Sequence, residues 1–398
     1  MNQRETALDI LHKTISKESY SNLLMRKELE KFPVVQRAFI TNLVNGVLRH
    51  YEFLHYQIED EIKKNTSLKT RLILIMALFE RFVNKEKDYV VNNEYVALAS
   101  NRYEKAFVNA LLHKIKNLKV CDDEAKANNL PEWIYRLLKA QYSETQLKEI
   151  LKVYQSVPEL YYRLNKHKAS LKDLKDLDIE QVNDDIFTCK KNLLNSAEYK
   201  KGLFYIQDLN SSSLYKHLEL KQNDVLLDVC SAPGSKLFNC LDIVKAENAY
   251  SNDFHSSRVE LIQKMADRLG FEGIHYLNFD GRQIKDNVDV LFDKILLDAP
   301  CSGLGVIGRK PDLKFHVRPE SLDELEKLQF ELLEAMDPIL KEKGILLYST
   351  CTLNKKENEK LIKRFTDKYS NYKLLEDETI INDNGDCFYY AKLSKESS

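Results

Sequence analysis

Two cysteines of this chain occupy equivalent places, each directly after an apolar stretch typical of a buried β-strand. Cys301 ends the stretch "LLDAPC" and Cys351 ends "LLYSTC". Turn residues follow both, which favours exposed thiols over small buried apolar side chains, the alternative reading of a free cysteine. The thiolate is the reactive form of cysteine, so a thiol pair at strand ends predicts nucleophilic catalysis.

A pyrimidine base is a substrate that would need two thiols. C5 of cytosine is a poor nucleophile, and addition of a thiolate at C6 turns C5 into an enamine-like carbon that can take a methyl group. A base must then remove the C5 proton so that the thiol can leave. One cysteine can attack while the other assists release, and a carboxyl group near N3 or N4 would stabilise the adduct. We therefore predict Asp298, Cys301 and Cys351 as the catalytic residues.

Acidic residues end four apolar stretches in succession, at Asp228, Asp253, Asp280 and Asp298. In a doubly wound sheet the carboxyl ends of the strands meet at one edge, where ligands bind. Asp253 is suited to accept hydrogen bonds from ribose hydroxyls, and Asp280 could reach an adenine amino group. The acidic edge suits a positively charged ligand, so we predict S-adenosylmethionine as the cofactor.

The first of these stretches continues into the turn "DVCSAPGSK", after which a helix is expected. Small turn residues allow the backbone to approach a ligand, and the helix offers N–H groups to an anion. The pattern GxGxxG is absent, which favours a ligand with one small carboxylate over a dinucleotide and disfavours an oxidoreductase. An ordinary strand–helix turn is the alternative. The predicted cofactor-binding residues are Cys230, Ser231, Ala232, Pro233, Gly234, Ser235, Lys236, Asp253, Asp280 and Asp298.

The chain contains three regions that differ in the spacing of their apolar residues and in the secondary structure expected from it. Residues 1–125 read as an all-α bundle, with apolar residues at helical spacing and almost no Gly or Pro. Residues 126–203 predict a small α+β domain, in which Pro131 opens a helix and "PELYYRLN" and "DDIFTCK" form short strands. Residues 204–398 alternate strands and helices, which predicts an α/β, Rossmann-like domain with a largely parallel sheet. The apolar positions of one predicted helix are Ile40, Leu43, Val44, Val47, Leu48, Tyr51, Leu54 and Ile58.

Composition narrows the class of protein. The formal charge is −1, from 60 basic and 61 acidic residues, so any nucleic-acid-binding face must be local. The longest apolar run is too short to span a bilayer, and the N-terminus resembles no signal peptide, so we expect a cytoplasmic protein without a membrane partner. Seven cysteines without a CxxC pair argue against a disulfide framework and a zinc site. We expect a monomer without a metal.

The motifs quoted above, with "NDF", "FDGR", "LLDAPCSGLGVIGRKPDLK" and "YSTCTLNKKENE", resemble those of the Sun (RsmB-type) family of RNA cytosine-C5 methyltransferases. The resemblance implies that Cys351 is the nucleophile and that Cys301 assists product release. "QRAFITNLVNGVLRHYEFLHYQI" and "AFVNALLHKI" resemble an N-terminal NusB-like RNA-binding domain. This architecture implies a cytosine of 16S ribosomal RNA as the substrate.

Three positions depart from the family pattern. Gly308 stands where an arginine is usual, which removes one expected phosphate contact. Ser235 replaces a common glycine, which is tolerable if its φ is negative. Cys387 interrupts the usual last strand and is expected to be structural.

Basic residues follow the "PCS" motif and are expected near the mouth of the site. A base within a stem must be flipped out or already unpaired before a thiol can reach it. We predict phosphate contacts at Arg309, Lys310, Lys314 and Arg318, with His316 nearby and with Arg37 and Arg49 as weaker candidates. Two alternatives stay open: a tRNA cytosine-C5 methyltransferase, and a non-catalytic ribosome-assembly or antitermination factor.

Overall fold

The computed structural model describes residues 2–382 and 385–397. The chain divides into two compact units, which we call the helical unit and the sheet unit. The helical unit comprises Met1–Ser156 and Ile307–Val317, and the sheet unit comprises Val157–Val306 and Arg318–Ser398. The short segment 307–317 therefore interrupts the sheet unit in sequence and packs within the helical unit.

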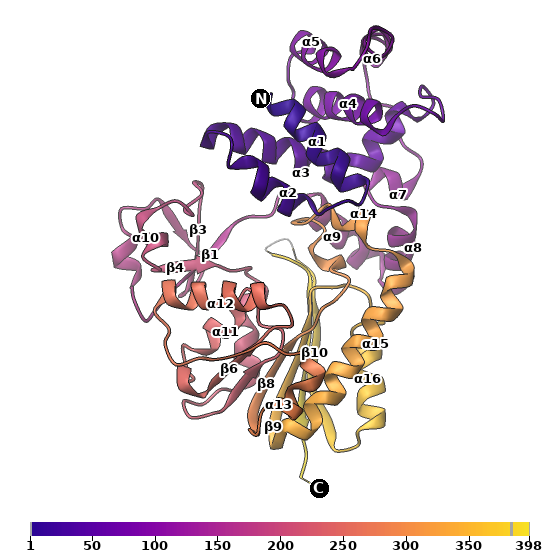
Figure 1. The fold of residues 1–398 in the computed structure, drawn as a ribbon. Coiled ribbons are helices and arrows are strands. Elements are labelled where there is room, and N and C mark those ends of the chain that lie inside the picture. The colour runs from indigo at the N-terminus through magenta and orange to yellow at the C-terminus, as the bar shows by residue number, and fades with distance from the viewer. Residues whose placement is uncertain (1, 383–384, 398) are drawn as a thin grey trace. The chain divides into compact units, whose positions relative to one another are not determined.

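The helical unit confirms the all-helical prediction for the N-terminal region (Figure 1). The predicted apolar stripe of α3 is buried, apart from Tyr51, which is half-buried. Gly46 lies against the Phe79 ring so closely that a Cβ there would come within 2.0 Å of it. Its helices are α1 (Gln3–Ile15), α2 (Ser21–Leu29), α3 (Val34–Glu59), α4 (Leu68–Leu78), α5 (Asp88–Leu98), α6 (Arg102–Lys114), α7 (Glu124–Ala127), α8 (Glu132–Gln141), α9 (Glu144–Gln155) and α14 (Leu313–His316), with a π-helical turn at Phe79–Val83.

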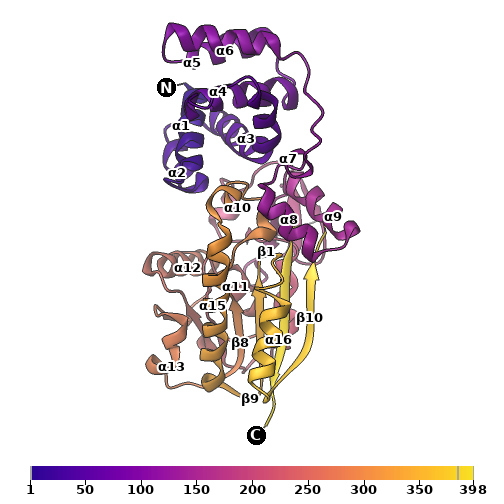
Figure 2. The ribbon, with the colours of Figure 1, turned by 90° about the vertical axis from the view of Figure 1, so that its right-hand side faces the viewer.

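The helical unit extends further than the boundary predicted at residue 125. α8 starts directly after Pro131, as expected. α7 and α9 pack against α3, and α8 packs against α7 and α9. Asn129 accepts a hydrogen bond from the backbone N–H of Phe53 at 3.2 Å. The apolar stripes of α8 and α9 are one-sided, so each helix needs a neighbouring helix to cover it. Figure 2 shows α7, α8 and α9 as a consecutive group.

The sheet unit begins with a small antiparallel sheet in the order β2-β3-β1-β4. The two predicted strands are present as β1 (Tyr161–Leu164) and β3 (Ile186–Cys189). β4 joins this sheet, so the sheet runs past the boundary predicted at residue 203. Its other elements are β2 (Ile179–Gln181), β4 (Phe204–Ile206), α10 (Ala197–Lys200) and a 3₁₀ turn at Leu171–Leu174.

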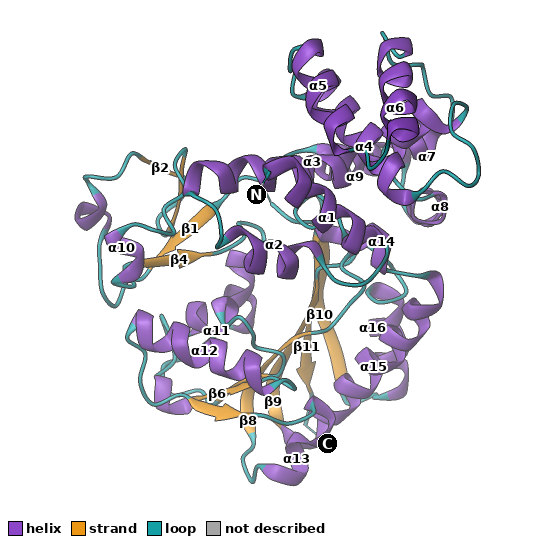
Figure 3. Ribbon diagram, turned by 45° about the horizontal axis from the view of Figure 1, so that its top comes forward, coloured by secondary structure: helices purple, strands orange, loops and turns teal. Residues whose placement is uncertain are grey.

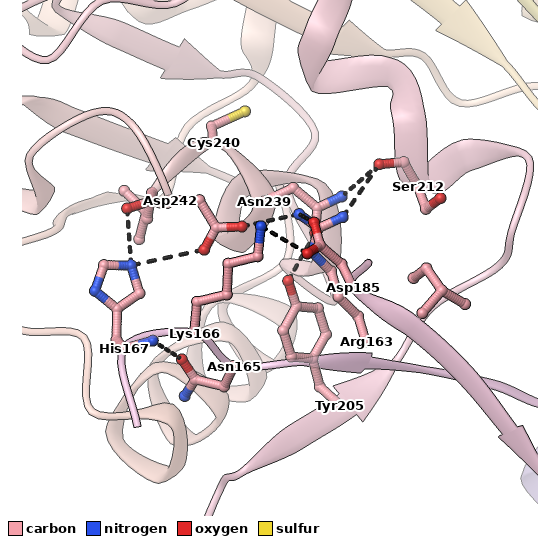
Figure 4. Close-up of polar contacts among 12 residues, drawn as sticks. Arg163, Asn165, Lys166, His167, Asp185, Tyr205, Ser212, Asn239, Cys240 and Asp242 are labelled. Carbon is pink, nitrogen blue, oxygen red and sulfur yellow. Dashed lines mark hydrogen bonds and ion pairs between the residues drawn. The ribbon is translucent and has the colours of Figure 1, made fainter. Parts of the chain in front are cut away.

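A buried polar cluster joins the small sheet to the rest of the sheet unit (Figure 4). The Arg163 guanidinium donates to the carboxylates of Asp185 at 3.2 Å and Asp242 at 2.8 Å. Tyr205 donates its hydroxyl proton to Oδ1 of Asn239 at 2.7 Å. Removing one partner of such a buried pair leaves an uncompensated charge. The cluster therefore anchors the small sheet against the α11 region.

The large sheet has the strand order β10-β11-β9-β8-β5-β6-β7. β5 to β9 are mutually parallel, and β10 and β11 add an antiparallel edge (Figure 3). The chain order reverses between β5 and β8, which is the switch point beside which doubly wound sheets bind ligands. The predicted Rossmann-like fold is thus present, and its sheet is largely parallel, as predicted, with an antiparallel edge. The strands are β5 (Leu226–Asp228), β6 (Ala249–Asn252), β7 (His275–Leu277), β8 (Phe292–Asp298), β9 (Leu340–Thr350), β10 (Tyr372–Ile380) and β11 (Phe388–Lys395).

Helices cover both faces of this sheet and make two separate apolar cores (Figure 1). One core lies under α11 and α12, and the other under α13, α15 and α16. No described helix is both long and apolar enough to cross a membrane. The covering helices are α11 (Ser235–Cys240), α12 (Ser256–Leu269), α13 (Ile284–Asn287), α15 (Pro319–Met336) and α16 (Glu359–Lys368).

Candidate active site

Two neighbouring parallel strands bring the two cysteines together. Asp298, the last residue of β8, lies opposite Ser349 of β9, so the loops that leave these strands start side by side. The sulfur atoms of Cys301 and Cys351 are 3.3 Å apart. The backbone N–H of Gly305 also donates to the carbonyl of Cys351 at 2.9 Å. Both side chains are partly exposed, which leaves room for a substrate to approach.

The two thiols are chemically unequal. The hydrogen bond to Cys351 and burial both raise the pKa of the Cys301 thiol well above its usual value. Cys301 is therefore a neutral thiol at neutral pH and can donate its proton towards the other sulfur. The ammonium of Lys236 experiences the charge of Cys351, so a thiolate at Cys351 would be attracted to that cation. A thiol hydrogen-bonded to a second thiol beside a cation is an arrangement suited to nucleophilic catalysis.

An ion pair adjoins the cysteines. Lys236 Nζ donates to Oδ2 of Asp298 at 2.5 Å, and Ser349 Oγ donates to Oδ1 at 2.8 Å. Burial acts to lower the pKa of Lys236, but the charge of Asp298 and its hydrogen bond outweigh burial and raise that pKa. Lys236 is thus a fixed cation beside the predicted catalytic carboxylate. From the sequence, Lys236 was predicted only as a residue of the cofactor turn. The contact between Lys236 and Asp298 arises because β5 pairs with β8.

The turn after β5 has the tight geometry that its small residues indicated. Gly234 has φ +103°, in the left-handed region, and a Cβ there would come within 2.7 Å of the Phe238 ring. The Ala232–Pro233 peptide is cis. Ser235 starts α11 and is not among the described residues with positive φ, so its replacement of glycine is tolerated as expected.

Asp228 is the last residue of β5 and belongs to the acidic edge of the sheet, although it was not among the predicted cofactor-binding residues. It is buried, and both carboxylate oxygens lack a hydrogen-bond donor among the described residues. Burial raises the pKa of Asp228 to about 7, and the nearby Ser231 hydroxyl, although not in hydrogen-bonding geometry, offsets part of this rise. Ser231 Oγ and Asp253 Oδ2 are also buried without a hydrogen-bond partner in the part of the chain that the structure describes. Unsatisfied acceptors of this kind fit a ligand that brings donors, such as an ammonium group and ribose hydroxyls.

The other two acidic strand ends differ in how they are held. Asp253, just after β6, is buried, accepts from the N–H of His255 at 3.1 Å and lies 3.5 Å from Arg258 Nη1. Asp280 follows β7 and accepts hydrogen bonds from Arg282, which lower its pKa. Arg258 thus forms an ion pair with Oδ2 of Asp253 without a hydrogen bond, whereas Arg282 donates hydrogen bonds to both carboxylate oxygens of Asp280.

The basic residues predicted to contact phosphate are in different environments. Lys310 and Arg318 are exposed, and Arg309 is partly exposed. Lys314, however, is buried in the helical unit, where its ammonium donates to the carbonyls of Asn129 at 2.7 Å and of Arg49 at 3.3 Å. Burial lowers the pKa of Lys314 to about 7. In this structure Lys314 is thus occupied in packing the 307–317 segment.

Arg49, a weaker candidate, is likewise buried, and its Nη2 donates to the carbonyl of Gly308 at 2.9 Å. Gly308 itself has a packing role. A Cβ at this position would come within 2.7 Å of the carbonyl oxygen of Val153, so glycine is what permits the close approach. Cys387 is fully buried, in keeping with the structural role expected for it.

The site lies on a seven-stranded mixed sheet with an acidic edge at its switch point. The tight turn after β5 and the thiol pair are typical of a Rossmann-like methyltransferase. Residues 215–394 match the family described as 16S rRNA methyltransferase RsmB/F, and residues 1–117 match the NusB family. The chain is 30% identical over 397 residues to the probable ribosomal RNA small subunit methyltransferase B of Bacillus subtilis (strain 168), covering 93% of this chain and 89% of that protein. This chain belongs to the RsmB/F methyltransferase family and carries a NusB domain.

Solved structures share the fold. The crystal structure of PH0851 superposes with a TM-score of 0.80 at 21% identity and covers 99% of each chain. The structure of NSun6 from Pyrococcus horikoshii with SFG has a TM-score of 0.61 at 20% identity, covering 67% of this chain and 99% of that one. These structures confirm the predicted fold, and the match to the Bacillus subtilis relative confirms the predicted family.

Proposed function

We propose that this enzyme transfers the methyl group of S-adenosylmethionine to C5 of a cytosine in 16S ribosomal RNA, through a covalent bond between Cys351 and C6 of the base. The observation that carries the proposal is the 3.3 Å approach of the Cys301 and Cys351 sulfurs beside the Lys236–Asp298 ion pair. S-adenosylmethionine supplies an electrophilic methyl group when bound. The residues suited to hold it are the turn from Cys230 to Lys236, with the unsatisfied acceptors of Asp228 and Asp253.

The thiols act in sequence. The Cys351 thiolate adds to C6, and the electron pair of the C5=C6 bond becomes available at C5 for bonding to the methyl carbon. The bond from that carbon to the sulfonium sulfur of the cofactor would break, with its electron pair remaining on the sulfur. Asp298, held by Lys236 and Ser349, is the carboxylate assigned to the polar edge of the base. The Cys301 thiol loses its proton to solvent, and the resulting thiolate, a strong base because its pKa is raised, takes the C5 proton. The C5–H electrons then reform the double bond, and the C6–S electrons return to Cys351 as thiolate.

RNA binding is assigned to both units. Lys310 of the helical unit and Arg318 of the sheet unit are exposed cations suited to phosphate contacts. A NusB domain in the helical unit supports an RNA-binding role for that unit. The name of the Bacillus subtilis relative supports small-subunit ribosomal RNA over tRNA as the substrate.

Methyl transfer from labelled S-adenosylmethionine tests the proposal. Wild type and Cys301→Ala are incubated with unmodified 16S rRNA and with tRNA, and a denaturing gel resolves covalent adducts. We expect label on 16S rRNA with wild type, and a trapped protein–RNA adduct with Cys301→Ala. Label on tRNA alone would overturn the substrate assignment, and freely released product from Cys301→Ala would overturn the role of Cys301.

A further inference from the structure

A carboxylate that the proposed chemistry does not use lies between the two cysteine loops. Glu357 belongs to the loop after β9, and its side chain is fully buried. Its Oε2 accepts hydrogen bonds from the backbone N–H of Ser302 and from Nε2 of Gln329, both at 2.9 Å. Its Oε1 accepts from Ser302 Oγ at 2.6 Å and from Asn354 Nδ2 at 3.1 Å. One carboxylate thus collects donors from three separate segments.

Two hydroxyl residues beside this carboxylate are the immediate sequence neighbours of the two cysteines. Ser302 directly follows Cys301, and Thr352 directly follows Cys351. The hydroxyl oxygens of Ser302 and Thr352 are 2.6 Å apart, and the Thr352 hydroxyl lies 3.5 Å from Glu357. The carboxylate therefore links the residue after one thiol to the residue after the other.

A third support comes from α15. The side-chain amide of Gln329 donates both to Glu357 and to the carbonyl of Pro300, each at 2.9 Å. Pro300 directly precedes Cys301, so the backbone on both sides of this cysteine is held by the same hydrogen-bond network. Tyr348 of β9 donates its hydroxyl proton to the Glu357 carbonyl at 2.8 Å, which fixes the position of the glutamate itself.

The donors that the described residues direct at this carboxylate are all uncharged. A buried anion without a basic partner is unfavourable for stability, since neutral hydrogen bonds replace its hydration only in part. Stability therefore does not explain a glutamate at this position, and the positions of its hydrogen-bond donors indicate a different role. We infer that Glu357 is a positioning residue, which holds the loops of Cys301 and Cys351 in the register that brings the two sulfurs together.

Glutamine cannot replace glutamate in this role. Both carboxylate oxygens accept hydrogen bonds, whereas an amide offers one accepting oxygen and one donating NH₂ group. In one orientation the NH₂ of a glutamine would face the backbone N–H of Ser302 and the amide of Gln329, which are both donors. In the other orientation it would face the donor Nδ2 of Asn354, although the Ser302 hydroxyl could turn to accept from it. Glu357→Gln is nearly isosteric, so it tests the hydrogen bonding without creating a cavity.

The separation of the thiols can be measured without any methylation assay. Diamide oxidises two neighbouring thiols to a disulfide, taking up their two protons and two electrons as it becomes a hydrazine. The sulfurs must close from 3.3 Å to about 2 Å, so the rate of cross-linking reports how often the two loops hold them close. Mass mapping of the Cys301–Cys351 peptide pair distinguishes this product from cross-links of other cysteines.

We expect Glu357→Gln to slow the Cys301–Cys351 cross-link at least tenfold in the full-length protein. The matched control is Glu326→Gln, which removes a largely buried carboxylate from α15 that is paired with Arg364. Among the described residues, no hydrogen bond or ion pair joins Glu326 to the cysteine loops. The control should cross-link at the wild-type rate. Equal rates for wild type and Glu357→Gln would overturn the inference.

The consequence for catalysis rests on the proposed function. Misplacement of a reacting group by about 1 Å can lower a rate by about 100-fold, so kcat should fall by that order. The KM for RNA and the affinity for S-adenosylmethionine should stay within about threefold of wild type. Among the described residues, the side-chain hydrogen bonds of Glu357 reach neither the basic residues nor the cofactor turn. If the wild type methylates no RNA while Glu357→Gln still slows the cross-link, the inference stands and the proposed function is refuted.

A second variant covers the case in which Glu357→Gln does not fold. Gln329→Met keeps the length of the side chain and removes the donor to both Pro300 and Glu357. Circular dichroism establishes that the variant is folded. A slower cross-link with unchanged cofactor affinity supports the network, and a wild-type rate contradicts it.

Discussion

Asp228 allows a prediction in which stability and function change in opposite directions. Its buried carboxylate has no hydrogen-bond donor among the described residues, and burial raises its pKa from 3.8 to about 7. Asp228→Asn keeps the shape of the side chain and removes the ionisable group. We expect this variant to be more stable than wild type without cofactor, and to bind S-adenosylmethionine more weakly.

Proton linkage gives the size of the stability difference between Asp228→Asn and wild type and the direction in which it changes with pH. A pKa raised from 3.8 to about 7 corresponds to at most about 4 kcal/mol against the ionised carboxylate in the folded state. The folded state of wild type binds more protons than the unfolded state in this window, so its stability falls as pH rises and levels off above about pH 7. The advantage of Asp228→Asn should therefore grow from pH 4 to pH 7. Loss of a charge-assisted hydrogen bond, about 1.5–3 kcal/mol, would weaken cofactor binding roughly 10- to 100-fold.

Hydrogen exchange of peptides from β5 and β8 measures the local free energy of opening at pH 5, 6, 7 and 8, and calorimetry measures cofactor affinity. Asp280→Asn is the matched control, because Arg282 lowers the pKa of Asp280. Its carboxylate stabilises the fold above its unfolded pKa, so the control should be destabilised at neutral pH, by about 1 kcal/mol or less. The sole tryptophan, Trp133, reports on the helical unit and should not respond. A pH-independent difference between wild type and Asp228→Asn would refute the reasoning.

Three further outcomes follow from the same structure. Cys351→Ala should abolish methyl transfer while cofactor affinity measured by calorimetry stays within about threefold, and retained turnover would disprove the nucleophile assignment. Gly308→Ala should destabilise the helical unit by about 1–3 kcal/mol, because its Cβ would press on a backbone carbonyl at 2.7 Å; denaturation followed by tryptophan fluorescence measures this. Lys310→Glu and Arg318→Glu should each weaken RNA binding and reduce the slope of log affinity against log salt by about 1. An unchanged slope would show that these cations do not contact phosphate.

Local pattern was sufficient to predict most elements of the chain. The apolar stripe of α3, the strands around Tyr161 and Ile186, and the alternation of strands and helices after residue 204 are all present. Each depends on residues a few positions apart, and periodicity within one element reports directly which of its faces is buried. The motifs that end in Cys301 and Cys351 were likewise sufficient to indicate the family.

The environment of each site residue depended on neighbours far apart in the sequence. Lys236 reaches Asp298 only because β5 pairs with β8, and Lys314, expected at the surface, is buried because its segment packs within the helical unit. In the sequence, nothing distinguishes Glu357 from the other charged residues of "KKENE". Its role depends on contacts with Ser302 and Gln329, which the fold brings next to it. Sequence by itself determined which residues could react and where strands would end. Only the tertiary structure decided which of them are buried, paired or left without a partner, because those properties come from contacts between distant segments, which no local pattern encodes.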